Sequence, residues 1–261
     1  MSNSDMNGLV KVTESGWRSG LSNLLSAAFG SWWRTKAWLI QALIWTAVIN
    51  GSLAAILWGD SPDGVSVFTL YGVMTMFAAI AVTIVMHETV VSEKKSGTAA
   101  WLLSKPVSRF AYILAKLLPN AIGVIVTMIF IPSSALYVQF VLAGLDVMVG
   151  RFALGALVAA LNLLFYLTLT LMLGTLFENG APVIGISLAF AFGQQFLSNI
   201  PCINTILPWS LLVPTGGSDV SAIGAIVAGH SVANPFALIF TGGSCVIFSA
   251  IAFWKFARTE L

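Results

Sequence analysis

Six long stretches of this chain contain no charged residue, and their length constrains the fold more than any other feature. Only 8% of the 261 residues are charged, and the charge-free stretches are residues 37–59, 64–86, 117–145, 152–177, 179–218 and 220–254. A soluble domain carries roughly 25% charged residues, because water must solvate its surface. A helix needs about 20 mostly apolar residues to cross a bilayer. We therefore expect an integral membrane protein whose surface faces lipid.

Each of the first four stretches has room for one membrane-spanning helix. Prolines break the fifth stretch after Ile200, and His230 and Pro235 confine the sixth span to the end of its stretch. Runs of this length without two-residue alternation favour helices over barrel strands. The sequence predicts an all-α membrane protein with a transmembrane domain over residues 37–256. Its six predicted spans cover residues 37–58, 66–86, 117–142, 152–177, 181–200 and 236–256.

Basic residues are concentrated on one side of the predicted spans. Eleven of the twelve lie before the first span, between the second and third, or at and beyond the end of the sixth, and only Arg151 lies in a loop on the other side. The positive-inside rule then makes both termini cytoplasmic, including the tail at 257–261. We expect a multi-pass protein of the cell membrane (plasma or inner). The net charge of +2 gives no reason to expect a nucleic-acid partner.

Two segments outside the spans are predicted to lie at the membrane surface. In the cytoplasmic N-terminal segment, residues 1–36, apolar residues recur at helical spacing from Trp17 to Trp32. This pattern predicts an amphipathic interface helix, acting either as a simple anchor or as a lever that moves with the transmembrane domain. Before the sixth span, the apolar segments 207–213 and 220–229 are too short to cross, so they are expected to be re-entrant or interfacial pieces on the outer side.

Motifs for catalysis and nucleotide binding are missing from the sequence. There is no G-x-x-x-x-G-K-[ST] loop to hold ATP phosphates, and Cys202 and Cys245 lack metal-ligand spacing. No ionisable residue lies deep within a predicted span, where ion-coupled carriers place such groups. We therefore expect no enzymatic activity, cofactor or metal in this chain. Energy for any pumping would have to come from a partner.

The loop between the second and third predicted spans is the only long hydrophilic loop. Its sequence predicts a short helix that carries Trp101, Leu102 and Leu103 and ends before Pro106. A second helix, with Ser108 as its N-cap, leads into the third span. An apolar helix displayed in the cytosol is unfavourable unless a partner covers it. The loop is therefore predicted to dock onto another protein.

The same loop resembles a signature of the six-helix type-2 exporter class of ABC transporter permeases. The family pattern is E-x-x-x-G-T-x-x-x-L-L-x-x-P-V-S-R followed by a lysine that opens the third span. Residues 93–109 and Lys116 carry this pattern here. The chain departs from it at Ala115, where relatives often have glycine, and its Trp101 is bulkier than expected.

The resemblance implies the permease subunit of an ATP-driven exporter. Two permease subunits, identical or different, would pair and dock onto two ABC ATPase subunits, which would bind ATP and Mg²⁺. The loop helix would be the coupling helix that transmits ATPase motion to the spans. The implied coupling residues are Glu93, Gly97, Thr98, Trp101, Leu102, Leu103, Pro106 and Arg109.

In the resembled family the second and fifth spans tend to face the dimer interface. Candidate residues for a translocation path on these spans are Met74, Phe77, Phe192, Gln194 and Gln195. At the docking surface, Glu93, Lys105 and Arg109 are candidates for ion pairs, although each is equally well explained as a solvated charge beside the membrane.

Two other hypotheses remain open. The chain is alternatively a non-pumping membrane channel or scaffold whose cytoplasmic helix docks onto a different partner. A membrane-embedded enzyme is the weakest alternative, because the sequence shows no cluster of His, Asp or Glu.

Overall fold

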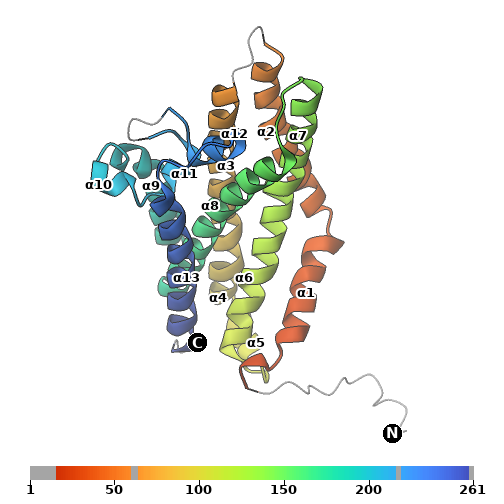
Figure 1. Cartoon of the computed structure of the whole chain (residues 1–261). Coiled ribbons are helices and arrows are strands. Elements are labelled where there is room, and N and C mark those ends of the chain that lie inside the picture. Colours follow the sequence, from red (N-terminus) through yellow and green to blue (C-terminus); the bar gives the residue numbers. More distant parts are fainter. Residues whose placement is uncertain (1–15, 60–63, 216–218, 259–261) are drawn as a thin grey trace.

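The computed structural model describes residues 16–59, 64–215 and 219–258, and within these ranges the regular structure is entirely helical. Six helical stretches are long and apolar enough to cross a membrane (Figure 1). The predicted all-α class with six spans is therefore confirmed. Outside the described residues lie residues 1–15 of the predicted N-terminal segment with its Lys11, the acidic Asp60 and Asp63 between the first two predicted spans, the glycine pair at 216–217 and the tail residues 259–261.

The six spans are formed by α2, α3, α6 with α7, α8, α9 and α13. The third span is continuous, because a π-helical turn, η3 (Val126–Phe130), joins α6 to α7. A second π-helical turn, η2 (Glu88–Ser92), extends α3 into the short helix α4. The bounds of these helices are α2 Ala37–Leu57, α3 Gly64–His87, α4 Glu93–Lys95, α6 Arg109–Ile125, α7 Ile131–Leu142, α8 Val149–Leu176, α9 Gly180–Leu197 and α13 Pro235–Ala257.

Helix ends differ from the predicted span ends where capping decides them. The third span was placed from residue 117, and the helix predicted to lead into it from a Ser108 cap is confirmed: α6 begins at Arg109, where the Ser108 hydroxyl accepts a hydrogen bond from the Ala111 amide at 2.9 Å. This bond satisfies one of the amides that the first helical turn leaves free. An apolar window locates the part of a helix that lies in lipid, but it does not show where the helix begins.

Helix α8 forms the centre of the bundle. It packs against α3, α9, α12 and α13 and is buried around most of its circumference. A helix that is apolar on all sides is stable only when other helices or lipid surround it. The outer spans instead expose large apolar side chains, such as Leu43 on α2 and Ile239 on α13. These exposed surfaces are suited to contact with lipid.

Buried amides link the spans to one another. The Gln139 amide of α7 donates to the Asn50 side-chain oxygen of α2 at 2.9 Å, and the Asn50 amide donates to the Pro132 carbonyl at 3.0 Å. Hydrogen bonds of this kind hold helices together where apolar packing alone gives little preference over lipid. These interior polar residues therefore serve helix association.

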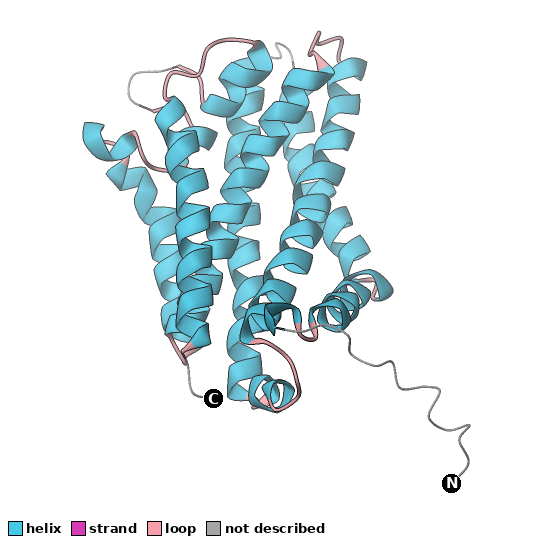
Figure 2. Ribbon diagram, turned by 60° about the horizontal axis from the view of Figure 1, so that its bottom comes forward, coloured by secondary structure: helices cyan, strands magenta, loops and turns pink. Residues whose placement is uncertain are grey.

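The two ends of the bundle carry different short elements (Figures 1 and 2). The end with α5 (Thr98–Leu103) and the C-terminus of α13 is called the α5 end, and the opposite end, with α10 to α12, the α12 end. Helix α12 buries five of its seven residues, against α3 and α8. The two segments predicted to be re-entrant or interfacial thus contain short helices that the bundle covers. Their bounds are α11 Trp209–Leu212 and α12 Ala222–Ala228, preceded by α10 Pro201–Asn204.

The predicted interface helix is α1 (Leu21–Arg34), preceded by the single turn η1 (Gly16–Arg18). Helix α1 packs along α6. Its Trp32 indole donates to the Asn120 side-chain oxygen at 3.1 Å, and the Trp32 ring lies against Gly123. Helix α1 is therefore attached to the third span by packing and by this hydrogen bond.

Candidate functional site

The loop at the α5 end folds into a compact unit that joins α3 to α6. Helix α4 ends in a tight turn at Gly97, which has a φ of 73° and caps the N-terminus of α5. This left-handed conformation is accessible to glycine without the steric penalty of a Cβ atom. No heavy atom lies within 4 Å of the position that a Cβ would occupy there. The backbone conformation, and not the available space, therefore accounts for glycine at this position of the motif.

Replacing Gly97 with alanine is expected to destabilise the loop by about 1 kcal/mol, because alanine is strained at positive φ. The measurement is the thermal unfolding midpoint of the purified chain in detergent. Gly30, in the interior of α1, is the matched control, since Gly30→Ala removes a poor helix former and is expected to raise stability slightly. Equal shifts of the unfolding midpoint, with the same sign in both variants, would contradict the strain assigned to alanine at residue 97.

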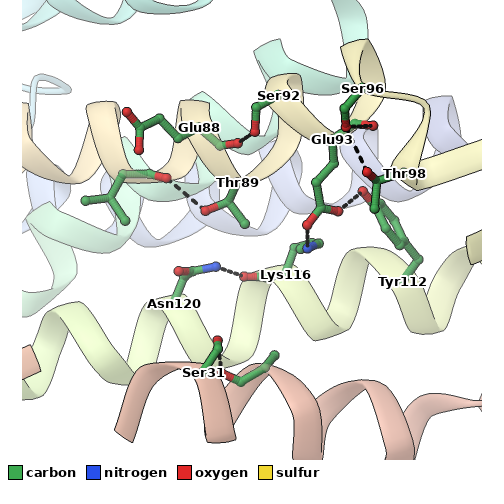
Figure 3. Close-up of polar contacts among 12 residues, drawn as sticks. Ser31, Glu88, Thr89, Ser92, Glu93, Ser96, Thr98, Tyr112, Lys116 and Asn120 are labelled. Carbon is green, nitrogen blue, oxygen red and sulfur yellow. Dashed lines mark hydrogen bonds and ion pairs between the residues drawn. The ribbon is translucent and has the colours of Figure 1, made fainter. Parts of the chain in front are cut away.

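Glu93 connects α4 to α6 (Figure 3). Its carboxylate lies 2.5 Å from the Lys116 ammonium and accepts a hydrogen bond of 2.8 Å from the Tyr112 hydroxyl. The Lys116 and Glu93 side chains are only 18% and 28% exposed, so solvent screens this ion pair less than one on an open surface. The structure therefore joins the first residue of the motif to its final lysine. We call Glu93, Tyr112 and Lys116 the Glu93 cluster.

Two basic residues of the loop bind the C-terminal ends of other spans. The Lys94 ammonium donates to the carbonyl oxygens of Gly174 and Phe177 at the end of α8, at 3.2 and 3.3 Å. The Arg109 guanidinium donates to the Ala257 carbonyl at the end of α13, at 2.9 Å. The last carbonyls of a helix have no partner within the helix and carry partial negative charge. The loop is thereby attached to α8 and α13 as well as to α3 and α6.

The apolar residues of α5 are divided between the core and the surface. Leu102 and Leu103 are partly buried against the hydrophobic core, whereas Trp101 is 61% exposed. The Lys105 ammonium lies 3.7 Å from the centre of the Trp101 ring. Successive residues of a helix point about 100° apart, so three adjacent apolar residues do not share one face. The predicted exposed set of three is thus corrected to one exposed tryptophan; Thr98, the first residue of α5, is also exposed.

The charged residues considered for ion pairs at a docking surface are engaged within the chain. Glu93 belongs to the Glu93 cluster, Lys105 lies over Trp101, and Arg109 binds the end of α13. Pro106 is exposed at the break between α5 and α6. Its carbonyl accepts a hydrogen bond of 2.6 Å from the Ser19 hydroxyl. These contacts hold the loop in place from several sides.

The N-terminal turn η1 docks directly onto the loop, which the sequence did not predict. The Ser108 amide donates to the Ser19 carbonyl at 3.0 Å, and the Ser108 hydroxyl donates to the Trp17 carbonyl. The Trp17 ring also meets Phe110 edge to face, with centroids 5.3 Å apart. Movement of the loop would therefore be passed to η1 and α1.

The five residues considered for a translocation path do not line one surface. Phe77, Phe192 and Gln195 are exposed on the adjacent helices α3 and α9, whereas Met74 is partly buried against the core. Gln194 is 2% exposed. Its amide nitrogen donates to the Tyr166 hydroxyl of α8, and its oxygen accepts from the Trp209 amide at 3.0 Å. The structure thus places Gln194 as a link among α8, α9 and α11 inside the packing.

A family model described as a protein of unknown function, DUF2705, matches residues 37–261. The chain belongs to the DUF2705 family. The match begins at the first residue of α2, so the family region contains all six spans and the α5 loop. A comparison with curated proteins gives no match. This DUF2705 member is therefore a multi-pass membrane protein of a family whose function is unknown.

Two contacts of this DUF2705 chain were not predicted from its sequence. Tyr112 and Lys116 are four residues apart and so share one face of α6, a signal that could have identified Tyr112 as a second partner of Glu93. No comparable signal pointed to Lys94, because its carbonyl partners lie about 80 residues away along the chain.

Proposed function

We propose that this chain is the permease subunit of an ATP-driven ABC exporter, with the α5 end in the cytoplasm of a cell. The observation that carries the proposal is an exposed tryptophan on a short helix that is attached to several spans at once. Tryptophan is enriched among the residues that dominate binding energy in protein interfaces. The proposed partners are two ABC ATPase subunits, which bind ATP and Mg²⁺, while this chain has no catalytic role of its own.

The contacts of the loop suit it to transmit movement. Force applied at α5 would reach α3 through α4 and η2, and α6 through the Glu93 cluster. Lys94 and Arg109 would carry it to α8 and α13, and Ser108 would carry it to α1. The π-helical turn η2 lies where this path enters the membrane span, and such turns are frequent at functional sites.

Pairing with a second permease subunit is supported by the outer face of α9. Small residues recur there every four positions, and Cβ atoms added at Gly185 and Gly193 would meet nothing within 4 Å. Stripes of small residues allow membrane helices to approach closely. In the proposal this face contacts a second permease, either identical or related, and the cargo passes between the subunits. The four residues of the stripe are Ala181, Gly185, Ala189 and Gly193.

Trp101→Ala is expected to remove the ATPase subunits from the complex while the chain still inserts in the membrane. Loss of a central interface tryptophan often weakens binding by about 2 kcal/mol or more, roughly 30-fold. The measurements are the amount of chain in native membranes, the subunits that purify with it, and the Mg²⁺-dependent ATP hydrolysis of the purified complex.

Trp254→Ala is the matched control, because Trp254 is 55% exposed near the end of α13 and lies beside Arg258, as Trp101 lies beside Lys105. The control is expected to keep the ATPase subunits and the hydrolysis rate. A native complex that contains no nucleotide-hydrolysing subunit would refute the proposal and favour a channel or scaffold.

A further inference from the structure

A cavity of about 630 Å³ lies between α1, the end of α3 with η2, and α6. Binding sites for small molecules usually measure about 300–1,000 Å³. Its walls are largely apolar and include Leu24, Ala28 and Trp32 of α1, Val85 of α3 and Pro119 of α6. The proposed docking of α5 onto an ATPase does not require this cavity.

The charged groups of the cavity are two carboxylates and one ammonium. Glu88, Glu93 and Lys116 all line it. The π-helical turn η2, in which hydrogen bonds join residues five apart, brings Glu88 and Glu93 to the same cavity. Lys116 neutralises Glu93 within the Glu93 cluster, whereas no hydrogen bond or ion pair of the Glu88 carboxylate occurs among the described residues. Glu88 is exposed, so the cavity carries, on a side open to its surroundings, one carboxylate that no described side chain pairs with, beside apolar walls.

We propose that this cavity binds an amphiphile whose head group is a primary amine. The ammonium would donate charge-assisted hydrogen bonds to the Glu88 carboxylate, and the alkyl chain would lie against Trp32, Leu24 and Pro119. A neutral head group gains no charge attraction, and an anionic one is repelled. Two sources supply this chemistry: an aminophospholipid of the surrounding leaflet and a soluble alkylamine. Binding requires neither ATP nor a partner subunit, so the inference stands apart from the proposed function.

Trp32 provides a reporter within the cavity. The full chain is placed in phosphatidylcholine nanodiscs and titrated with 12-bromododecylamine or with neutral 12-bromododecanol, whose bromine quenches nearby tryptophan fluorescence. The amine is expected to quench saturably, and Trp32→Phe is expected to remove that saturable component. Glu88→Gln is expected to weaken the apparent affinity about tenfold, as loss of one charged hydrogen bond implies.

Glu178→Gln is the matched control, because Glu178 is an exposed carboxylate at the start of α9, at the same end of the bundle, but does not line the cavity. It is expected to bind the amine as the unmodified chain does. Equal saturable quenching by the amine and the alcohol, or an unchanged affinity in Glu88→Gln, would overturn the proposal.

The source of the amine is distinguished by changing the lipid. If an aminophospholipid occupies the cavity, replacing part of the phosphatidylcholine with phosphatidylethanolamine is expected to weaken the apparent affinity for the bromoamine by competition. If phosphatidylethanolamine leaves the affinity for the bromoamine unchanged, and Glu88→Gln still weakens that affinity, the ligand is a soluble alkylamine.

Discussion

Replacing Gly72 with alanine is expected to destabilise the bundle by about 3 kcal/mol, the upper part of the usual range for overpacking. The added Cβ on α3 would lie 2.0 Å from the Leu212 carbonyl oxygen and 2.8 Å from its carbonyl carbon. These are backbone atoms of the buried helix α11, so no side-chain rotation relieves the clash. Either α11 moves or α3 shifts within the core. The measurements are the yield of monodisperse protein in detergent and its thermal unfolding midpoint.

Gly242→Ala is the control for this prediction, because a Cβ at Gly242 on α13 would meet nothing within 4 Å. The same substitution in an open helical position is expected to be neutral or slightly stabilising. If Gly72→Ala and Gly242→Ala gave equal yields and midpoints, the close approach of α3 and α11 would be disproved.

Glu93→Gln is the second substitution with a large expected effect. Glutamine can still accept the Tyr112 hydrogen bond, but the Lys116 ammonium would lose its charge partner at 18% exposure. Removing one member of a buried pair costs about 3–5 kcal/mol. Because this pair is partly exposed, we expect about 2 kcal/mol, measured as the free energy of unfolding in detergent. If the proposed function holds, stimulation of ATP hydrolysis by cargo would also fall.

A double-mutant cycle separates the pair from each residue alone. Lys116→Gln is expected to lower the free energy of unfolding by a similar amount. The double variant, Glu93→Gln with Lys116→Gln, is expected to lower it by less than the sum of the two single effects. The difference measures the interaction between the two side chains. Strict additivity of the two single effects would show that Glu93 and Lys116 do not interact in the protein.

The number, class and approximate positions of the spans followed from the sequence alone. A charge-free run of about 20 residues must be solvated by lipid or by other helices, and this requirement depends only on the run itself. The Gly97 turn and the Ser108 cap are local in the same way, because a positive φ and an N-cap involve only a few neighbouring residues. The loop could therefore be divided correctly into helix, break and helix.

The side-chain environment was decided by the tertiary structure. Leu102 and Leu103 face the core while Trp101 remains exposed, and only the packing of α5 against the bundle determines this division. Gln194 appeared able to line a path, yet its partners on α8 and α11 place it inside the bundle.

The cavity likewise depends on α1 lying beside α6, which helical periodicity cannot show. The solvation of a segment and its backbone geometry are determined by short stretches of sequence. The partner of a polar side chain is set by segments that are distant along the chain and meet only when the helices pack.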